Sequence, residues 1–257
     1  MKKGLLLFIL ACVLTAGTLP AEETAKADNM ERLIFTPTAG GMNYGEYNVN
    51  FRMYKGGGML TRAVFGVLQG FNVGFSWNVD SLIGSQTPKG RDPNLYLKMD
   101  IFRGNYAFPK VSLGYDRQGY EWIDSTGTST QKYRIEPIGF FLVMTKELFF
   151  PNFFVTGGAN YNKVLAENPD SFRDKISSFA GFSFKPSKFG FCAEGINLGR
   201  GNGLCRFNAG AILQFTEGLE FMLNFENITR TEIEENGKAL EDAKIERALS
   251  IIYRAAF

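Results

Sequence analysis

The sequence contains no histidine among its 257 residues. Ser-His and Cys-His nucleophile pairs need an imidazole base, and many catalytic zinc sites need imidazole ligands. The composition therefore excludes these classes of active site. We predict no catalytic residue, no metal site and no cofactor for this chain.

Long apolar runs are missing after the N-terminus, where no stretch of about 18 apolar residues could form a transmembrane helix. The first residues differ from the rest, because two lysines precede a short apolar core and Ala27 completes a small-x-small cleavage site. This order predicts a secretory signal peptide over 1–27, with Ala21 as an earlier alternative end.

Net charge is small as well. The formal charge is +2, and it falls to +1 when cleavage after Ala27 removes three lysines and two glutamates. That balance gives no support for nucleic-acid binding, so we predict no nucleic acid among the partners.

Cys12 lies in the signal peptide behind a poor lipobox, which makes a lipid anchor the weaker alternative there.

The mature chain has two cysteines, Cys192 and Cys205, in what would be an oxidising compartment. Their spacing suits a disulfide across a hairpin. The alternation around them places Cys192 on an inward face and Cys205 on an outward face, whereas direct cross-strand partners share a face. A disulfide would therefore need a bulge, and both alternatives stay open at this point.

Phenylalanine and glycine are abundant instead, with 25 and 29 copies. At the C-terminus, apolar residues alternate with small or charged ones, which predicts a half-buried strand. The ending resembles the C-terminal insertion signal of bacterial outer-membrane β-barrels, with Ala255 as a departure from that signal. The resemblance implies the cell outer membrane as location and the barrel-assembly machinery as a partner. The predicted signal residues are Leu249, Ile251, Tyr253 and Phe257.

The same alternation recurs along the chain between turn residues. The predicted strand segments are 47–53, 59–68, 71–79, 95–101, 111–115, 138–145, 153–161, 176–184, 189–195, 206–215, 219–226 and 247–257. The segment 59–68 is a weaker strand, and 138–145 is apolar on both faces, so its phase is ambiguous. Single-chain bacterial barrels have an even number of strands. We predict an all-β fold, a transmembrane antiparallel β-barrel of about 12 strands. The predicted order is signal peptide 1–27, periplasmic lead-in 28–46 and outer-membrane barrel 47–257.

The connections between these segments alternate between short and long, apart from a tight first hairpin at 55–58. Membrane barrels have short periplasmic turns and long external loops, so both termini are predicted to lie in the periplasm. Aromatic residues gather near the short-turn end, as in a membrane-interface belt. A soluble β-sandwich is the alternative, but it would not need the terminal Phe257 or the alternating loop lengths.

The last hairpin predicts its own register. Glu235-Asn236-Gly237 suits a three-residue loop closed by Glu234 opposite Lys238. A two-residue loop would instead place Leu219 opposite Arg254 and expose a charge to lipid. The three-residue loop predicts these pairs: Leu219 with Tyr253, Phe221 with Ile251, Leu223 with Leu249 and Phe215 with Phe257.

Inward positions of the predicted barrel carry charges of both signs. Closure of the last strand on the first would bring Arg52, Arg62 and Arg254 onto neighbouring inward faces. Balanced signs favour a cross-linked polar network over a strongly selective pore. A sharper hypothesis is an arginine stripe that contacts an acidic glycan. The predicted lumen residues are Arg52, Arg62, Lys98, Asp100, Glu194, Arg206, Glu220, Glu226, Glu246 and Arg254.

Four short motifs carry a family resemblance. The motifs are IFTPTA at 34–39, YGEYNVNF at 44–51, FNVGFSW at 71–77 and GYDRQGY at 114–120. They resemble YjbH-like outer-membrane proteins. The resemblance implies a link to exopolysaccharide production or export, and it supplies no catalytic residue.

Together these patterns predict a non-enzymatic outer-membrane barrel that supports envelope transport or exopolysaccharide export. The predicted partners are outer-membrane lipid, the barrel-assembly machinery and an acidic polysaccharide. A structural or adhesive barrel is the alternative, and a barrel enzyme is the less favoured third interpretation.

Overall fold

The computed structural model describes residues 30–105, 107–123, 132–135, 138–161, 176–198, 205–229, 234–235, 238–239 and 245–257. The predicted signal peptide lies outside these residues. Within the described ranges, no helix is long and apolar enough to cross a membrane.

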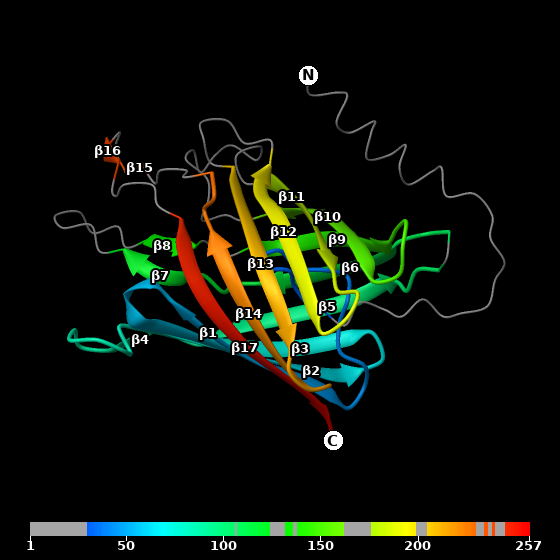
Figure 1. Cartoon of the computed structure of the whole chain (residues 1–257), viewed down its shortest axis with the longest axis horizontal. Coiled ribbons are helices and arrows are strands. Elements are labelled where there is room, and N and C mark those ends of the chain that lie inside the picture. Colours follow the sequence, from blue (N-terminus) through cyan, green and yellow to red (C-terminus); the bar gives the residue numbers. More distant parts are fainter. Residues whose placement is uncertain are drawn as a thin grey trace.

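Twelve antiparallel strands form one closed barrel, because each strand pairs with its neighbour in the chain and the last pairs with the first (Figure 1). This confirms the predicted fold class. The wall strands are β1 (Glu46–Tyr54), β2 (Gly58–Leu68), β3 (Phe71–Asp80), β5 (Asn94–Phe102), β6 (Lys110–Asp116), β9 (Gly139–Glu147), β10 (Phe153–Tyr161), β11 (Ile176–Phe184), β12 (Phe189–Leu198), β13 (Arg206–Gln214), β14 (Leu219–Glu226) and β17 (Glu246–Ala256).

Short elements decorate the end of the barrel that carries the long loops. A 3-10 turn, η1 (Lys55–Gly57), joins β1 to β2, and β4 (Lys89–Gly90) adds to the end of β3. Two small hairpins form separate two-stranded sheets in the β6–β9 and β14–β17 connections. They are β7 (Tyr120–Ile123) with β8 (Lys132–Ile135), and β15 (Glu234–Glu235) with β16 (Lys238–Ala239).

The wall is apolar outside and polar inside. In β17, Ser250 and Ile252 are buried in the interior, whereas Leu249 and Tyr253 are 38% and 46% exposed on the outer face. Most large exposed side chains on the wall are apolar, while many charged side chains are buried. A water-soluble protein has the opposite distribution. This inversion, in a closed antiparallel sheet, is the arrangement of a transmembrane β-barrel.

The predicted register between β14 and β17 is confirmed. Leu219 stands opposite Tyr253, and Leu223 stands opposite Leu249. The loop from which this register was predicted was wrong. Lys238 stands opposite Glu235 and not Glu234, so the loop has two residues and not three. The apolar outer face sets the register of the wall strands, and the loop tip follows its own pairing.

The predicted pair of Phe215 and Phe257 was also wrong. Phe215 lies in the turn before β14, where its N–H donates to the carbonyl of Leu219. The ring of Phe257 packs instead against Tyr47, 6.0 Å away between ring centroids. The Phe257 N–H donates to the carbonyl of Gly45 at 3.0 Å, so the two ends of the barrel wall meet at the short-turn end.

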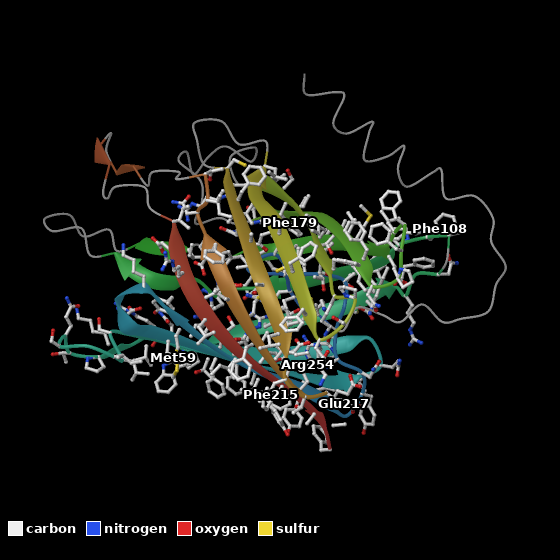
Figure 2. All side chains as sticks on the ribbon, in the orientation of Figure 1. Met59, Phe108, Phe179, Phe215, Glu217 and Arg254 are labelled. Carbon is white, nitrogen blue, oxygen red and sulfur yellow. The ribbon has the colours of Figure 1, made fainter. Side chains whose placement is uncertain are left out.

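The short-turn end carries exposed aromatic rings, as the sequence predicts. Phe149 and Phe189 are among the most exposed side chains there, and Figure 2 shows Phe108 and Phe215 at this end. Aromatic rings favour the boundary between lipid tails and head groups. The outer face therefore has the apolar band and the aromatic border that a bilayer would match.

The start of the described chain departs from the prediction. The sequence predicts a periplasmic lead-in over 28–46, but Met30 to Met42 lie inside the barrel, where nearly all of them are buried (Figure 1). The physical reason is that the apolar side chains of Leu33, Ile34 and Phe35 find apolar partners on the inner wall. We call Met30–Met42 the luminal hairpin.

Candidate functional site

The luminal hairpin folds on itself before it contacts the wall. Arg32 and Pro37 form an antiparallel bridge. The N–H of Leu33 donates to the carbonyl of Thr36 at 3.0 Å, and the N–H of Thr38 donates to the carbonyl of Glu31 at 3.0 Å. These bonds satisfy backbone groups that would otherwise be buried without partners. The hairpin thus carries part of its own hydrogen bonding into the lumen.

Glu194 of β12 receives the tip of the hairpin. Its carboxylate accepts the backbone N–H groups of Ile34, Phe35 and Thr36 at 3.0 Å each, and the Thr36 hydroxyl at 2.9 Å. Asn208 of β13 donates to the other carboxylate oxygen at 2.8 Å. A carboxylate with several donors is a strong, directional contact in a buried site. Glu194 therefore fixes both the position and the orientation of the tip.

A charged cluster holds the middle of the hairpin. Glu31 accepts from Arg62 of β2 at 2.5 Å, and Arg62 also donates to Asp116 of β6 at 3.0 Å. Arg32 forms a second ion pair with Asp116. The Arg62 guanidinium lies 4.1 Å from the ring centroid of Tyr96, as in a cation–π contact. The hairpin charges of Glu31 and Arg32 and the wall charges of Arg62 and Asp116 thus neutralise one another.

Polar side chains of the wall bind the base of the hairpin. Lys98 of β5 donates to the carbonyls of Thr38 and Gly40. Thr145 of β9 accepts the N–H of Ala39 at 2.8 Å. Asn72 of β3 accepts the N–H of Met42 at 3.2 Å and donates to its carbonyl at 2.8 Å. The base is therefore fixed from three different strands.

An apolar patch covers part of the inner wall opposite the hairpin. Interiors of membrane barrels are normally polar, so inward apolar side chains need a partner. The tip residues Leu33, Ile34 and Phe35 supply it by packing in one cluster with the patch. The patch residues from β12, β13, β14 and β17 are Cys192, Ile212, Met222, Ala248 and Ile252.

The remaining predicted lumen residues pair along the wall. Arg52 bonds to Glu226, and it also donates to the carbonyl of Ile34 at 3.0 Å. Glu220 lies 2.5 Å from the Lys185 ammonium and 3.2 Å from the Arg254 guanidinium.

Three more of the predicted residues lie on β5, β13 and β17. Asp100 pairs with Lys110 at 2.8 Å. Glu246 is buried opposite Glu226 in the register, and Arg206 is half-buried at the start of β13. The three predicted arginines do not form one open stripe, since Arg52, Arg62 and Arg254 each bind separate carboxylates.

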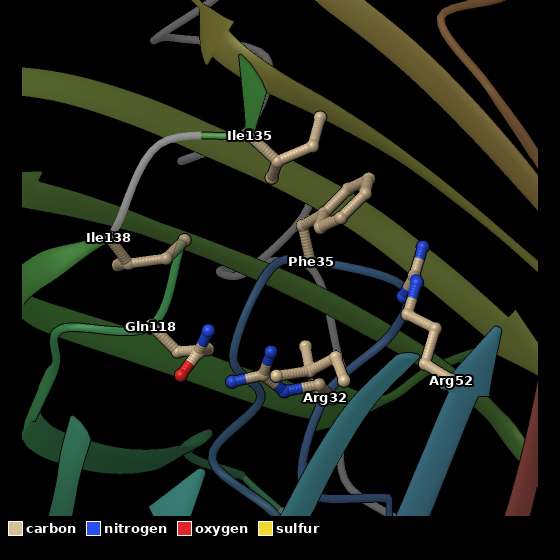
Figure 3. Close-up of a pocket in the computed structure, with 7 residues that line it drawn as sticks. Arg32, Phe35, Arg52, Gln118, Ile135 and Ile138 are labelled. Atoms are coloured by element: carbon tan, nitrogen blue, oxygen red, sulfur yellow. The ribbon is translucent and has the colours of Figure 1, made fainter. Parts of the chain in front are cut away.

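A small pocket lies between the hairpin tip and the long-loop end of the barrel. Its volume is about 20 Å³, which is room for one water molecule and too little for a solute. Figure 3 shows Phe35 and Arg52 beside it, and the Arg52 guanidinium lies 4.4 Å from the Phe35 ring centroid. The lining residues are Arg32, Phe35, Arg52, Leu60, Gln118, Ile135 and Ile138.

The two cysteines lie apart. Cys192 stands opposite Gly210 in the β12–β13 ladder, and Cys205 precedes β13. Gly210 follows Cys205 by five positions of mostly extended chain, which span about 16 Å. No disulfide joins the two cysteines. Cys192 instead belongs to the apolar patch.

Sequence reasoning missed the luminal hairpin, although one signal was present. Met222, Ile212 and Ile252 are large apolar residues at inward positions of strands whose other inward residues are polar or small. Such exceptions on a predicted lumen face indicate that something apolar fills the lumen. Residues 33–35 form an apolar segment shortly before the first strand in the sequence. The patch that they contact lies on strands far along the chain, and the two meet only when the barrel closes.

No family model matches the sequence, and no curated protein gives a significant match. Among solved structures, the NanC porin matches with 11% identity and a TM-score of 0.41, over 82% of this chain and 99% of that chain. The outer membrane channel DcaP of Acinetobacter baumannii matches with 10% identity and a TM-score of 0.29, over 82% and 95%. A chain from a de novo design of transmembrane β-barrels matches with 8% identity and a TM-score of 0.22, over 83% and 98%. These values identify no family for this chain.

Proposed function

We propose that the protein is a non-enzymatic outer-membrane barrel that supports transport across the cell envelope, and that this structure is its closed state. One observation carries the proposal: a membrane-type wall encloses a charged interior that a separate segment fills. Barrels of about 8 strands fill themselves with side chains, while those of 16 or more leave an aqueous channel. Twelve strands lie between these limits, and here the luminal hairpin occupies the surplus space.

The resemblance to YjbH-like proteins supports exopolysaccharide export as the process served. Outer-membrane lipid and the barrel-assembly machinery are the proposed partners of the outer face and of the C-terminal strand. An acidic polysaccharide is the proposed cargo or partner on the strength of that resemblance. The interior arginines offer it no open stripe, because Arg52, Arg62 and Arg254 are bound to carboxylates of the chain itself.

A structural or adhesive barrel is the second candidate. The filled interior favours it, since a barrel that carries nothing across the membrane gains stability from a packed lumen. The two functions differ in one property, which is whether the wall encloses a continuous water path once the hairpin is absent.

Planar-bilayer recording of a variant that lacks residues 31–41 tests the proposed function. The folded variant should give stepwise conductance well above that of the full chain. Heat-modifiable migration on a gel would confirm that the variant barrel has folded. A folded variant that does not conduct would reject transport and leave the structural barrel.

A further inference from the structure

We propose that the luminal hairpin is a reversible plug and that Glu194 is its latch. The inference rests on the transport function proposed above and adds how the path would open. Residues 30–39 would leave the lumen as a unit by a change at Gly40 and Gly41, while the wall keeps its shape.

The hairpin is not part of the barrel sheet. Among the described residues, the only isolated bridge joins Arg32 to Pro37 within the hairpin, and the ladders of the barrel sheet join wall strands to one another or β3 to β4. A wall strand could leave only by breaking two ladders of backbone hydrogen bonds. The hairpin is held by side-chain contacts instead, so its departure leaves the sheet intact.

An anchor at the barrel rim ties the hairpin to the wall. Gly45 adopts a left-handed conformation with φ of 82°, and its N–H donates to the carbonyl of Gly66 in β2 at 3.0 Å. The Asn43 N–H donates to the Glu46 carboxylate at 2.8 Å. Asn72 holds Met42 beside this anchor, and Gly40-Gly41 joins Met42 to residues 30–39. Two adjacent glycines give the backbone the most freedom. The hairpin can therefore swing about a fixed rim.

Much of the wall's charge pairing survives without the hairpin. Arg52 keeps Glu226, Arg62 keeps Asp116, and Glu220 keeps Lys185 and Arg254. Two charged wall residues lose most: Glu194 loses four donors, and Lys98 loses two carbonyl acceptors. Their charges are opposite, and water entering the open lumen would solvate both. The wall is therefore suited to the empty state as well as the filled one.

Glu194 concentrates the hairpin's strongest contacts on one side chain. Glu194→Gln keeps the shape but removes the charge and turns one acceptor oxygen into an NH₂ donor. That donor would face backbone N–H groups, which are donors themselves. Hydrogen bonds to a charged group contribute more than neutral ones. The variant should therefore release the hairpin more often without altering the wall ladders.

Thiol labelling measures this release without relying on transport. Ala39 is fully buried in the hairpin, so Ala39→Cys reports exposure in a background where Cys192 and Cys205 are replaced by Ala. Glu194→Gln should raise the labelling rate by a membrane-impermeant maleimide at least about tenfold. Glu220→Gln is the matched control, because Glu220 is equally buried and its ion pairs are with Lys185 and Arg254. It should change the rate by less than about twofold.

Three outcomes separate the possibilities. Faster labelling in Glu194→Gln alone supports the plug, and its open fraction in bilayers should then rise in proportion. Equal rates in the two variants, or no labelling of either folded protein while the SDS-unfolded protein reacts, overturn the latch and the plug. If the hairpin labels but the variant lacking 31–41 does not conduct, the plug moves and the proposed transport function fails.

Discussion

Some side chains on the inner wall contact other wall residues, whereas others contact the luminal hairpin. Glu220 and Glu226 bind cations of the wall, whereas Glu194 binds the hairpin backbone. The same division applies to apolar residues. Met222 faces inward against the hairpin cluster, while its neighbour Leu223 faces outward and is 42% exposed. This division can be tested one side chain at a time.

Met222→Ala should destabilise the full chain by about 2–4 kcal/mol, because it leaves a cavity against the hairpin tip. In the variant lacking residues 31–41 the same change should cost far less, since the tip is gone. Urea unfolding in lipid vesicles, run as a double-mutant cycle, measures the difference. Leu223→Ala is the control, and its effect should be the same with and without the hairpin. Equal costs for Met222→Ala in both backgrounds would contradict the packing described here.

Arg62 is the residue whose loss should harm the interior most. It binds Glu31 and Asp116, and its side chain is 4% exposed. Arg62→Gln leaves the buried Glu31 carboxylate without this cation and leaves Asp116 with Arg32, and breaking a buried ion pair typically costs about 3–5 kcal/mol. Arg91→Gln breaks the more exposed pair with Asp80 and should cost less than about 1 kcal/mol. The free energy of unfolding in urea compares them, and a near-neutral Arg62→Gln would contradict a structural role.

At the scale of elements, alternation in the sequence was enough to place the wall strands. Each of the twelve predicted segments overlaps one wall strand, because a strand with lipid on one face and a polar lumen on the other must alternate. The β14–β17 register also followed from apolar pairing. The loop between them did not, because Glu235-Asn236-Gly237 fits both a three-residue and a two-residue turn.

The hairpin could not be predicted as an element for a different reason. Residues 31–38 have no period of 2 or 3.6, and Pro37 discourages a strand assignment. Their apolar and charged side chains are satisfied only by residues far along the chain, such as Glu194 and Asp116. The ten predicted lumen residues are placed on wall strands, but the segment that fills the lumen comes from the predicted lead-in.

The strand register gives a prediction at this scale. Phe221 stands directly opposite Ile251 on the outer face, whereas Ile252 faces the lumen. Cysteines at 221 and 251 should form a disulfide on oxidation, because cross-strand partners lie about 4.5–5.5 Å apart between Cβ atoms. Cysteines at 221 and 252 should not. Gel migration without reductant distinguishes them, and preferential bonding of the second pair would mean a register one residue away.

At the scale of the whole molecule, the charges of the wall nearly cancel along the lumen. Arginines and lysines lie beside carboxylates along the lumen, from Arg254 with Glu220 toward the short-turn end to Arg52 with Glu226 toward the long-loop end. A pore gains strong selectivity from rings of one sign. Here the two residues that lose most when the hairpin leaves, Glu194 and Lys98, also have opposite signs. The open barrel should therefore favour neither anions nor cations.

The reversal potential of the variant lacking residues 31–41 measures this balance. Under a tenfold gradient of KCl it should stay within roughly 10 mV of zero, because paired charges leave little net field along the path. Adding Lys98→Glu places two uncompensated carboxylates in the lumen and should shift the potential toward the cation limit. Adding Lys98→Gln instead should give a smaller shift of the same sign. Strong anion selectivity in the variant lacking residues 31–41, with Lys98 unchanged, would contradict this balance. It would mean that the arginines form an open stripe once the hairpin has left. An acidic glycan would require that arrangement.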